Sequence, residues 1–219
     1  MSGVRVPEGA KLVLATRNAH KVRELRQILA EVMGEHAADV DLDHAVIGAA
    51  DIDGVEDVVE SGVTFAENSL LKAHSVCAAT GLPSVADDSG LAVEVLSGAP
   101  GVFSARWSGS HGNDKANLEL LLDQLSDVPD EHRAAKFVCA AALVTPDGDE
   151  RVEHGELAGW LERSPRGSGG FGYDPIVRVE NDTRTVAELP DDEKNAISHR
   201  GRAVRKLAPA LVALLTAVQ

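Results

Sequence analysis

Apolar residues recur along the chain in two patterns, which predict short strands and amphipathic helices. Short apolar runs bounded by turn residues predict strands, at Lys11–Ala15, Ala45–Ile47, Ser84–Asp87, Leu91–Leu96, Ala135–Thr145 and Arg151–Leu161. Apolar residues spaced three and four positions apart predict helices, at Asn18–Val32, Phe65–Thr80, Asn113–Leu125 and His199–Val218. No internal repeat or linker divides the chain, so we expect residues 1–219 to form a single domain.

The ends of these elements carry their own signals. Asn18 can cap the first helix, and Thr64 with Glu67 predicts a capping box at the start of the second. Gly81 should end that second helix. Pro209 should kink the last helix or break it in two, because proline has no amide to donate.

Two adjacent acids, Asp87 and Asp88, interrupt the apolar stretch Val85–Val93. Neighbouring strand residues point to opposite faces, so the two carboxylates share one task only if the strand breaks here. Gly90 would tolerate the bend that such a break needs. The pair would suit Mg²⁺, which takes one or two carboxylates together with substrate phosphates, or supply a base toward water. An ordinary turn explains the same residues, and the stretch alone favours the turn.

A strand, a loop and a helix bring Thr16, Asn18 and Lys21 to one place. A helix N-terminus favours anions through its free N–H groups and its dipole, so this segment is a candidate phosphate site. It has no glycine-rich phosphate loop, and Lys21 taken alone is typical of a solvated helix position.

Two further candidates for a functional site are Lys72, within the second predicted helix, and Glu60, a few residues before it. Lys72 lies in mid-helix, where a solvated position is the simpler interpretation. Glu60 has no capping function, unlike Glu67, and is therefore a candidate for holding metal-bound water.

The segment Arg166–Pro175 contains four glycines and two aromatic residues. Glycine lets a backbone approach a ligand closely, and we expect Phe171 and Tyr173 to be exposed on this loop. A flexible linker is the alternative, but linkers rarely carry aromatic residues next to Asp-Pro. The composition favours a binding loop that stacks on a planar group.

Lys194, His199 and Arg200 concentrate cations at the start of the last predicted helix. Cations are unfavourable at a helix N-terminus, so something other than helix stability accounts for them. A surface charge cluster is an equally good interpretation.

Composition and charge limit the possible functions. The net charge of −14 argues against a general nucleic-acid or membrane binder, since such proteins rely on basic surface. No apolar run reaches the roughly 18 residues of a membrane span, and the residues up to Lys11 lack the core of a signal peptide. Cys77 and Cys139 have apolar neighbours and no CxxC pairing, which indicates buried, reduced thiols in a cytoplasmic protein.

Together, a phosphate cradle, an acidic pair, a stacking loop and a cation cluster describe a nucleoside triphosphate site. The sequence resembles the inosine/xanthosine triphosphate pyrophosphatase family, which hydrolyses non-standard purine nucleotides. The matching segments stand in the family's order: LATRNAHKVRELRQIL, ESGVTFAENSLLKA, SVADDSGLAVEVLSGAPGVFSARWSG, GGFGYDPI and ELPDDEKNAISHRGRA.

The resemblance implies an elongated α/β fold, with a long mixed central sheet flanked by helices in two lobes and the substrate in a groove between them. It also implies a homodimer, a Mg²⁺ requirement and hydrolysis of ITP, dITP or XTP to the monophosphate and pyrophosphate, by water attack on the α-phosphorus. Such an enzyme would cleanse the nucleotide pool and so prevent misincorporation into DNA and RNA.

The resemblance also assigns individual residues. Asp88 matches the proton acceptor and metal ligand, with Asp87 and Glu60 as further metal candidates. The residues that match substrate-binding positions are Thr16, Arg17, Asn18, Ala19, His20, Lys21, Lys72, Ser89, Phe171, Gly172, Tyr173, Asp174, Lys194, His199 and Arg200.

The chemistry of the base agrees with this assignment. Hypoxanthine and xanthine carry a 6-oxo group, which donors such as Lys194 and His199 can recognise, whereas the amino group of adenine would face donors. Each buried donor left unpaired costs about 1–3 kcal/mol. Two alternatives remain: a pyrophosphatase of pyrimidine or modified nucleotides, and a regulator that binds nucleotides without chemistry.

Overall fold

The computed structural model of the chain describes residues 4–217, which form two compact units. The first unit contains residues 4–88, 140–154 and 200–217, and the second contains residues 89–139 and 155–199. Three long strands contribute residues to both units: β3 (Ser84–Val93), β4 (Ala134–Val144) and β5 (Glu150–Leu161). Whether the whole chain acts as one domain remains a prediction.

The described residues build one mixed six-stranded sheet with the strand order β2-β1-β3-β4-β5-β6. β1 (Leu12–Leu14) lies parallel to both β2 (Val46–Gly48) and β3, whereas β6 (Val177–Val179) is antiparallel to β5. Strands β4 and β5 are joined by a turn that the amide of Gly148 closes on the carbonyl of Thr145. The expected mixed sheet flanked by helices is confirmed.

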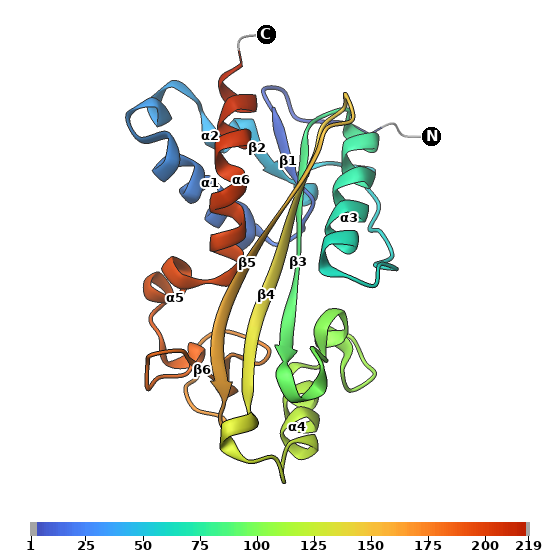
Figure 1. Ribbon diagram of the computed structural model, residues 1–219. Coiled ribbons are helices and arrows are strands. Elements are labelled where there is room, and N and C mark those ends of the chain that lie inside the picture. The colour runs from blue at the N-terminus through green and yellow to red at the C-terminus, as the bar shows by residue number, and fades with distance from the viewer. Residues whose placement is uncertain (1–3, 218–219) are drawn as a thin grey trace. The chain divides into compact units, whose positions relative to one another are not determined.

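Helices cover both faces of the sheet in the first unit (Figure 1). α1 (Ala19–Met33), α2 (Leu42–Ala45) and α6 (His199–Thr216) lie on one side of β1, and α3 (Phe65–Thr80) lies on the other. Ala73 and Cys77 of α3 pack against Ala86 of β3. Val85, the preceding strand residue, points to the other face and lines a small pocket with residues of α1 and α6.

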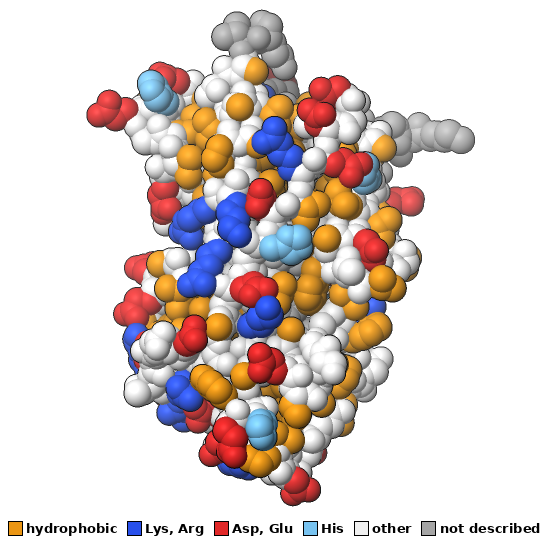
Figure 2. Space-filling model, viewed as in Figure 1, with side chains coloured by type: hydrophobic (Ala, Val, Ile, Leu, Met, Phe, Trp, Pro, Cys, Tyr) orange, Lys and Arg blue, Asp and Glu red, His pale blue; other side chains and the backbone are white. Residues whose placement is uncertain are grey.

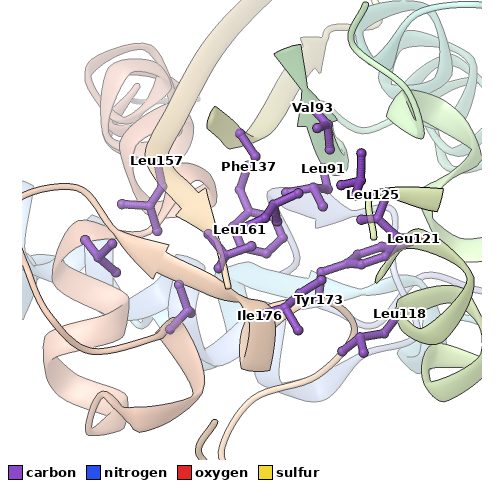
Figure 3. Close-up of a cluster of buried hydrophobic side chains, with 14 of the residues drawn as sticks. Leu91, Val93, Leu118, Leu121, Leu125, Phe137, Leu157, Leu161, Tyr173 and Ile176 are labelled. Atoms are coloured by element: carbon purple, nitrogen blue, oxygen red, sulfur yellow. The ribbon is translucent and has the colours of Figure 1, made fainter. Parts of the chain in front are cut away.

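The core of the second unit is one cluster of buried side chains (Figure 3). α4 (Asp114–Gln124) contributes Leu118 and Leu121, and Phe137 comes from β4. Tyr173, from the glycine-rich segment, directs its ring into the same cluster. This packing anchors the loop that the sequence predicts to bind a ligand.

The first three predicted helices are confirmed, and so are the caps expected for the first two. The Asn18 side chain accepts a hydrogen bond from the His20 amide at the start of α1. Thr64 and Glu67 form the expected capping box of α3, and Gly81 ends this helix in the left-handed conformation. Local hydrogen bonds of this kind join residues only two to four positions apart, which is why sequence predicts them well.

The prediction of a turn or strand break at Asp87–Gly90 is wrong, because β3 continues from Ser84 to Val93 without interruption. Gly90 serves a different purpose from a bend. A Cβ atom at this position would lie 2.6 Å from the carbonyl oxygen of Gly101 and would also collide with the Ser104 side chain. The glycine therefore permits the close approach of the 3₁₀ helix Gly101–Arg106.

The C-terminal region also differs from expectation. A separate short helix, α5 (Asp191–Ile197), precedes α6 and carries Lys194 in its last turn, where a cation is favourable. α6 is a single helix that contains Pro209, so the proline does not divide it. The expected helix end at Val218 lies outside the described residues.

Both cysteines are buried and form no disulfide, as predicted. No helix within residues 4–217 is long and apolar enough to cross a membrane. Figure 2 shows acidic side chains spread over the viewed face, with lysine and arginine side chains between them.

Candidate functional site

The carboxylates of Asp87 and Asp88 lie on opposite faces of the sheet. Asp87 faces α1 and α6, where it bonds with Lys21 and Arg200. Asp88 faces α3, where its carboxylate bonds with Asn68. Because β3 stays extended here, neighbouring side chains alternate between faces, and the two acids have different surroundings.

Asp88 is held in place by α3. The amide group of Asn68, whose side chain is fully buried, donates to Asp88 Oδ2 at 3.0 Å and accepts from the Gly62 amide. Lys72, one helical turn further along, places its Nζ 3.8 Å from Asp88 Oδ1. The carboxylate therefore has a fixed orientation and a cation beside it.

Lys72 also contacts two other oxygens. Its ammonium donates to Glu60 Oε1 at 2.8 Å and to the backbone carbonyl of Asp87 at 2.7 Å. Only 19% of the Lys72 side chain is exposed, so the solvated interpretation is wrong. Glu60 and Asp88 thus share one counter-ion, which brings two acids from distant parts of the sequence to the same side of β3.

Asp87 is almost completely buried and binds two cations. Lys21 Nζ donates to both carboxylate oxygens, at 3.1 and 2.9 Å, and Arg200 Nε donates to Oδ2 at 3.0 Å. Burial alone would raise the pKa of Asp87, but the charges of Lys21 and Arg200 outweigh it and hold this pKa far below its usual range. Lys21 is therefore a partner of a buried acid, and its interpretation as a solvated residue is wrong.

Glu24 lies next to this group on α1. Its carboxylate oxygen Oε2 is 3.8 Å from Arg200 Nη1, and it lines the same small pocket as Lys21 and Asp87. Burial raises the pKa of Glu24, although the charge of Arg200 acts in the opposite direction.

The remaining residues of the Thr16–Lys21 segment shape the start of α1. Thr16 Oγ1 accepts from the Asn18 amide, and the Asn18 side chain caps the helix. Ala19 and His20 are exposed, and His20 Nδ1 contacts a guanidinium nitrogen of Arg23 at 2.7 Å.

Arg17 is directed toward the acidic loop that follows β2. It donates to the Asp57 carboxylate at 3.0 Å and to the Val55 carbonyl at 2.9 Å. This places a basic residue of the predicted phosphate segment in contact with the loop that carries Glu60.

In the second unit, the glycine-rich loop brings Phe171, Asp174 and Lys194 together. Asp174 is buried, and its Oδ2 accepts from the Lys194 ammonium at 2.7 Å and from the Phe171 amide at 2.9 Å. The Lys194 ammonium lies 4.9 Å from the centre of the Phe171 ring. Phe171 is 63% exposed, so a fixed cation lies over an aromatic ring that is still largely accessible.

Gly170 is required by this arrangement. Its φ of +72° favours glycine, and a Cβ atom there would collide with the Asp174 carboxylate and lie 2.9 Å from Lys194 Nζ. The amide of the next glycine, Gly172, donates to Asp114 Oδ2 at the start of α4.

The expectation that Tyr173 is exposed is wrong. Only 5% of this residue is accessible, and its hydroxyl donates to the Ser104 carbonyl at 2.9 Å. Its phenol satisfies a buried acceptor while the ring joins the core, so Tyr173 anchors the loop rather than presenting a surface.

His199 lies at the start of α6 and stacks on Phe137 of β4. The ring centres are 5.1 Å apart, with 16° between the ring planes. Ser89 follows Asp88 on β3 and is partly buried.

The donor set on the α3 side of β3 fits a hard cation. Glu60 and Asp88 supply carboxylate oxygens, which Mg²⁺ prefers, and this ion usually needs only one or two of them because substrate phosphates and water complete its shell. Within residues 4–217 no group of three or more His, Cys, Asp or Glu side chains could hold a metal ion by themselves. The carboxylate of Asp87 faces away from this set, toward Lys21.

Asn68, which bonds with Asp88, and Glu24, which lies beside Arg200, were not among the residues predicted from the sequence. Asn68 precedes Lys72 by four positions and Glu24 follows Lys21 by three, so each shares a helix face with a residue that was singled out. This spacing was a signal that could have identified both.

Comparisons with a family model and with known proteins point to the same family. The model of the Ham1 family matches residues 12–210. A protein of Streptomyces coelicolor named dITP/XTP pyrophosphatase is 60% identical over 205 residues, which cover 94% of this chain and 98% of the relative.

Solved structures are similar as well. A HAM1 protein from Coxiella burnetii superposes with a TM-score of 0.81 at 40% identity, over 92% of this chain and 98% of the other. A structure from Mycobacterium abscessus described as nucleoside-triphosphatase / dITP/XTP pyrophosphatase gives a TM-score of 0.73 at 47% identity, over 94% of this chain and 100% of the other. With a family model that spans nearly the whole chain and relatives of this similarity, the chain belongs to the Ham1 family.

Proposed function

We propose that this protein hydrolyses non-standard purine nucleoside triphosphates, ITP, dITP and XTP, to the monophosphate and pyrophosphate in a Mg²⁺-dependent reaction. One observation carries the proposal. Asp88 is held by Asn68 beside the Lys72–Glu60 pair, and this oriented carboxylate is what a general base toward water needs. Membership of the Ham1 family supports the same reaction.

The first unit supplies the groups for the phosphates. Lys21 and Lys72 provide cations, and the segment from Thr16 to His20 provides amide and hydroxyl donors at the start of α1. Phosphoryl-type transfer depends mainly on positioning and charge stabilisation, so no covalent nucleophile is required. Asp88 accepts the proton of the attacking water, and Ser89, with which the second unit begins, contacts the substrate.

Asp88 and Glu60 would hold Mg²⁺, which supplies charge neutralisation and Lewis-acid polarisation of phosphate oxygens when bound. Lys72 lies beside both acids, 2.8 Å from Glu60 Oε1 and 3.8 Å from Asp88 Oδ1. Asp87 was the third expected metal ligand, and its position toward Lys21 argues for a different function.

The second unit supplies the groups that recognise the base. The exposed ring of Phe171 offers a stacking surface, and Lys194, fixed by Asp174, donates to a 6-oxo group. Gly172 and Tyr173 keep the loop in shape, and His199 is a further donor of this unit. Arg200, which belongs to the first unit and bonds with Asp87, completes the set of donors. A site that offers donors to the 6-position accepts hypoxanthine and xanthine and disfavours adenine.

We further propose that the protein acts as a homodimer on the cytoplasmic nucleotide pool, as the family resemblance implies. Size-exclusion chromatography with light scattering tests the dimer.

The experiment that tests the function measures pyrophosphate released from ITP, dITP and XTP by the purified protein with Mg²⁺. ATP, GTP and the pyrimidine triphosphates are the comparison substrates. We expect release from the three non-standard purines and at least about a hundredfold lower kcat/KM for ATP. No release from any of the three would refute the proposal, and tight binding without turnover would support a regulator.

A further inference from the structure

We propose that Asp87 is a positioning residue, which holds Lys21 of α1 and Arg200 of α6 in place for the nucleotide and does not bind the metal. The inference rests on the proposed function, because it assigns Asp87 a task in nucleotide binding. We call the group of Asp87, Lys21, Arg200 and Glu24 the Asp87 clamp.

The geometry of the Asp87 clamp links three elements on one face of the sheet. Asp87 stands on β3, Lys21 is separated from it by 66 residues and Arg200 by 113 residues. Lys21 is bonded to both oxygens of the carboxylate, and Arg200 shares one of them. Side chains as long as lysine and arginine lose much rotamer freedom in such a contact, and a buried carboxylate that holds them in advance lowers the entropic cost of binding a ligand.

The charges of the Asp87 clamp are balanced. Two cations, Lys21 and Arg200, face two acids, Asp87 and Glu24, and all four side chains are less than one quarter exposed. Buried charges persist only when they are paired. Removing the charge of Asp87 leaves two cations with one acid and should drive Lys21 and Arg200 apart.

The surroundings of the Asp87 carboxylate do not suit a metal ligand. The carboxylate of Asp88, which faces α3, has Asn68 and Lys72 beside it, whereas the carboxylate of Asp87 already carries three hydrogen bonds from two cations. A divalent cation at Asp87 would have to approach next to two cations that donate directly to this carboxylate, Lys21 and Arg200, whereas Lys72 Nζ lies 3.8 Å from the Asp88 carboxylate. Repulsion between like charges therefore disfavours the metal more strongly at Asp87 than at Asp88.

The first test compares Asp87→Asn with wild type in the turnover of ITP. Lys21 and Arg200 contact the nucleotide in both the ground state and the transition state, so their displacement acts mainly on KM. We expect KM for ITP to rise roughly tenfold or more, with kcat changed by less than about threefold. An unchanged KM would overturn the proposal.

A matched control is available on the same two helices. Glu31 of α1 and Arg205 of α6 form a more exposed ion pair at 3.6 Å, and neither residue is a member of the clamp. Glu31→Gln removes this link between α1 and α6, and we expect it to leave KM and kcat for ITP unchanged. A tenfold rise of KM in Glu31→Gln would show that any loosening of these helices is sufficient, which would contradict a specific function of Asp87.

The second test measures metal binding without turnover. Mn²⁺ binding is followed by electron paramagnetic resonance in the presence of an ITP analogue with a methylene group between the α and β phosphates. At saturating analogue, we expect Asp87→Asn to keep the Mn²⁺ affinity of wild type, and Asp88→Asn to lose roughly tenfold or more. A loss in Asp87→Asn as large as that in Asp88→Asn would make Asp87 a metal ligand and overturn the proposal.

A double variant addresses the case in which Asp87→Asn does not fold. Asp87→Asn with Lys21→Met leaves Arg200 opposite Glu24, so the charges balance again. We expect this double variant to unfold at a higher temperature than Asp87→Asn, and to raise KM by less than the product of the two single effects. Strict additivity in both measurements would mean that Asp87 does not act through Lys21.

Failure of the proposed function is distinguishable from failure of the clamp. If wild type releases no pyrophosphate, the function fails, and the Kd of the ITP analogue, measured by calorimetry, replaces KM in the same set of variants. A weaker Kd in Asp87→Asn with an unchanged Kd in Glu31→Gln still supports the clamp, and equal values in both overturn it.

Discussion

Asp87 and Asp88 are adjacent on strand β3, yet the Asp87 carboxylate bonds with Lys21 while the Asp88 carboxylate bonds with Asn68 on the opposite face of the sheet. The alternation of an unbroken strand separates them. One acid becomes the centre of a buried, charge-balanced group, and the other is oriented beside Lys72. The same dipeptide therefore places its two carboxylates in different surroundings without any special backbone geometry.

Asp88→Asn should keep nucleotide binding and lose turnover. Asparagine has the shape of aspartate and can still accept from Asn68, but its amide cannot take a proton from water. We expect kcat to fall by a factor of about 10²–10⁴, measured as pyrophosphate released from ITP at saturating Mg²⁺, with the Kd of ITP within about threefold of wild type. Rates like those of wild type would remove Asp88 from the catalytic function.

Lys194→Met should reduce the preference for 6-oxo purines. The methionine keeps the apolar stem but provides no donor and leaves the buried Asp174 carboxylate without its cation. We expect the ratio of kcat/KM for ITP to that for ATP to fall roughly tenfold.

The control for Lys194 is Lys136→Met, since Lys136 pairs with Glu156 at an exposed position of the same unit. It should leave the ratio unchanged. If Lys194→Met lowered kcat/KM for both nucleotides by the same factor, the lysine would bind the nucleotide without recognising its base.

Tyr173 should resist ionisation at high pH. Burial, followed by the charge of Asp114, raises its pKa well above the ordinary value of 10.0. The unfolded chain therefore loses this proton first, so the free energy of unfolding should fall as the pH rises above about 10. Because the chain contains a single tyrosine, the ultraviolet absorbance of phenolate reports this residue alone.

The measurement compares folded and urea-unfolded protein at the same alkaline pH. We expect the phenolate signal only in the unfolded protein, and no signal in either state for Tyr173→Phe. A folded protein that is half ionised near pH 10 would contradict the burial of this hydroxyl.

Arg133→Met should destabilise the fold without any effect on nucleotide chemistry. The side chain of Arg133 is 2% exposed and donates to the carbonyls of Leu125, Leu161 and Glu162, which tie the end of α4 to the end of β5. Buried acceptors left without donors cost free energy, and we expect a loss of about 2–4 kcal/mol in urea unfolding. The exposed substitution Lys136→Met should cost less than about 0.5 kcal/mol, and an equal loss in both variants would contradict this function of Arg133.

Local patterns specified a large part of the fold correctly. Helices α1 and α3, with their caps at Asn18 and Thr64, and helix α4 follow from residues two to four positions apart. The ordered motifs also identified the family, because the whole set in that order is specific although each motif alone has another explanation. Predictions of local structure were wrong where the same residue types occur both in turns and in strands. Asp87–Gly90 has the composition of a turn but continues a strand, and the glycine makes room for the Gly101–Arg106 segment instead of a bend.

Contacts between distant segments were decided by tertiary packing. From the sequence, Lys21, Lys72 and Tyr173 are recognisable as candidate substrate-binding residues. The sequence does not show that the two lysines pair with acids or that the phenol of Tyr173 is buried. Periodicity reports which face of an element a residue occupies, whereas its partner depends on which element packs against that face. For Asp87 the partner Arg200 lies 113 residues away, and only the stacking of α6 and α1 over the same face of β3 brings the charges together.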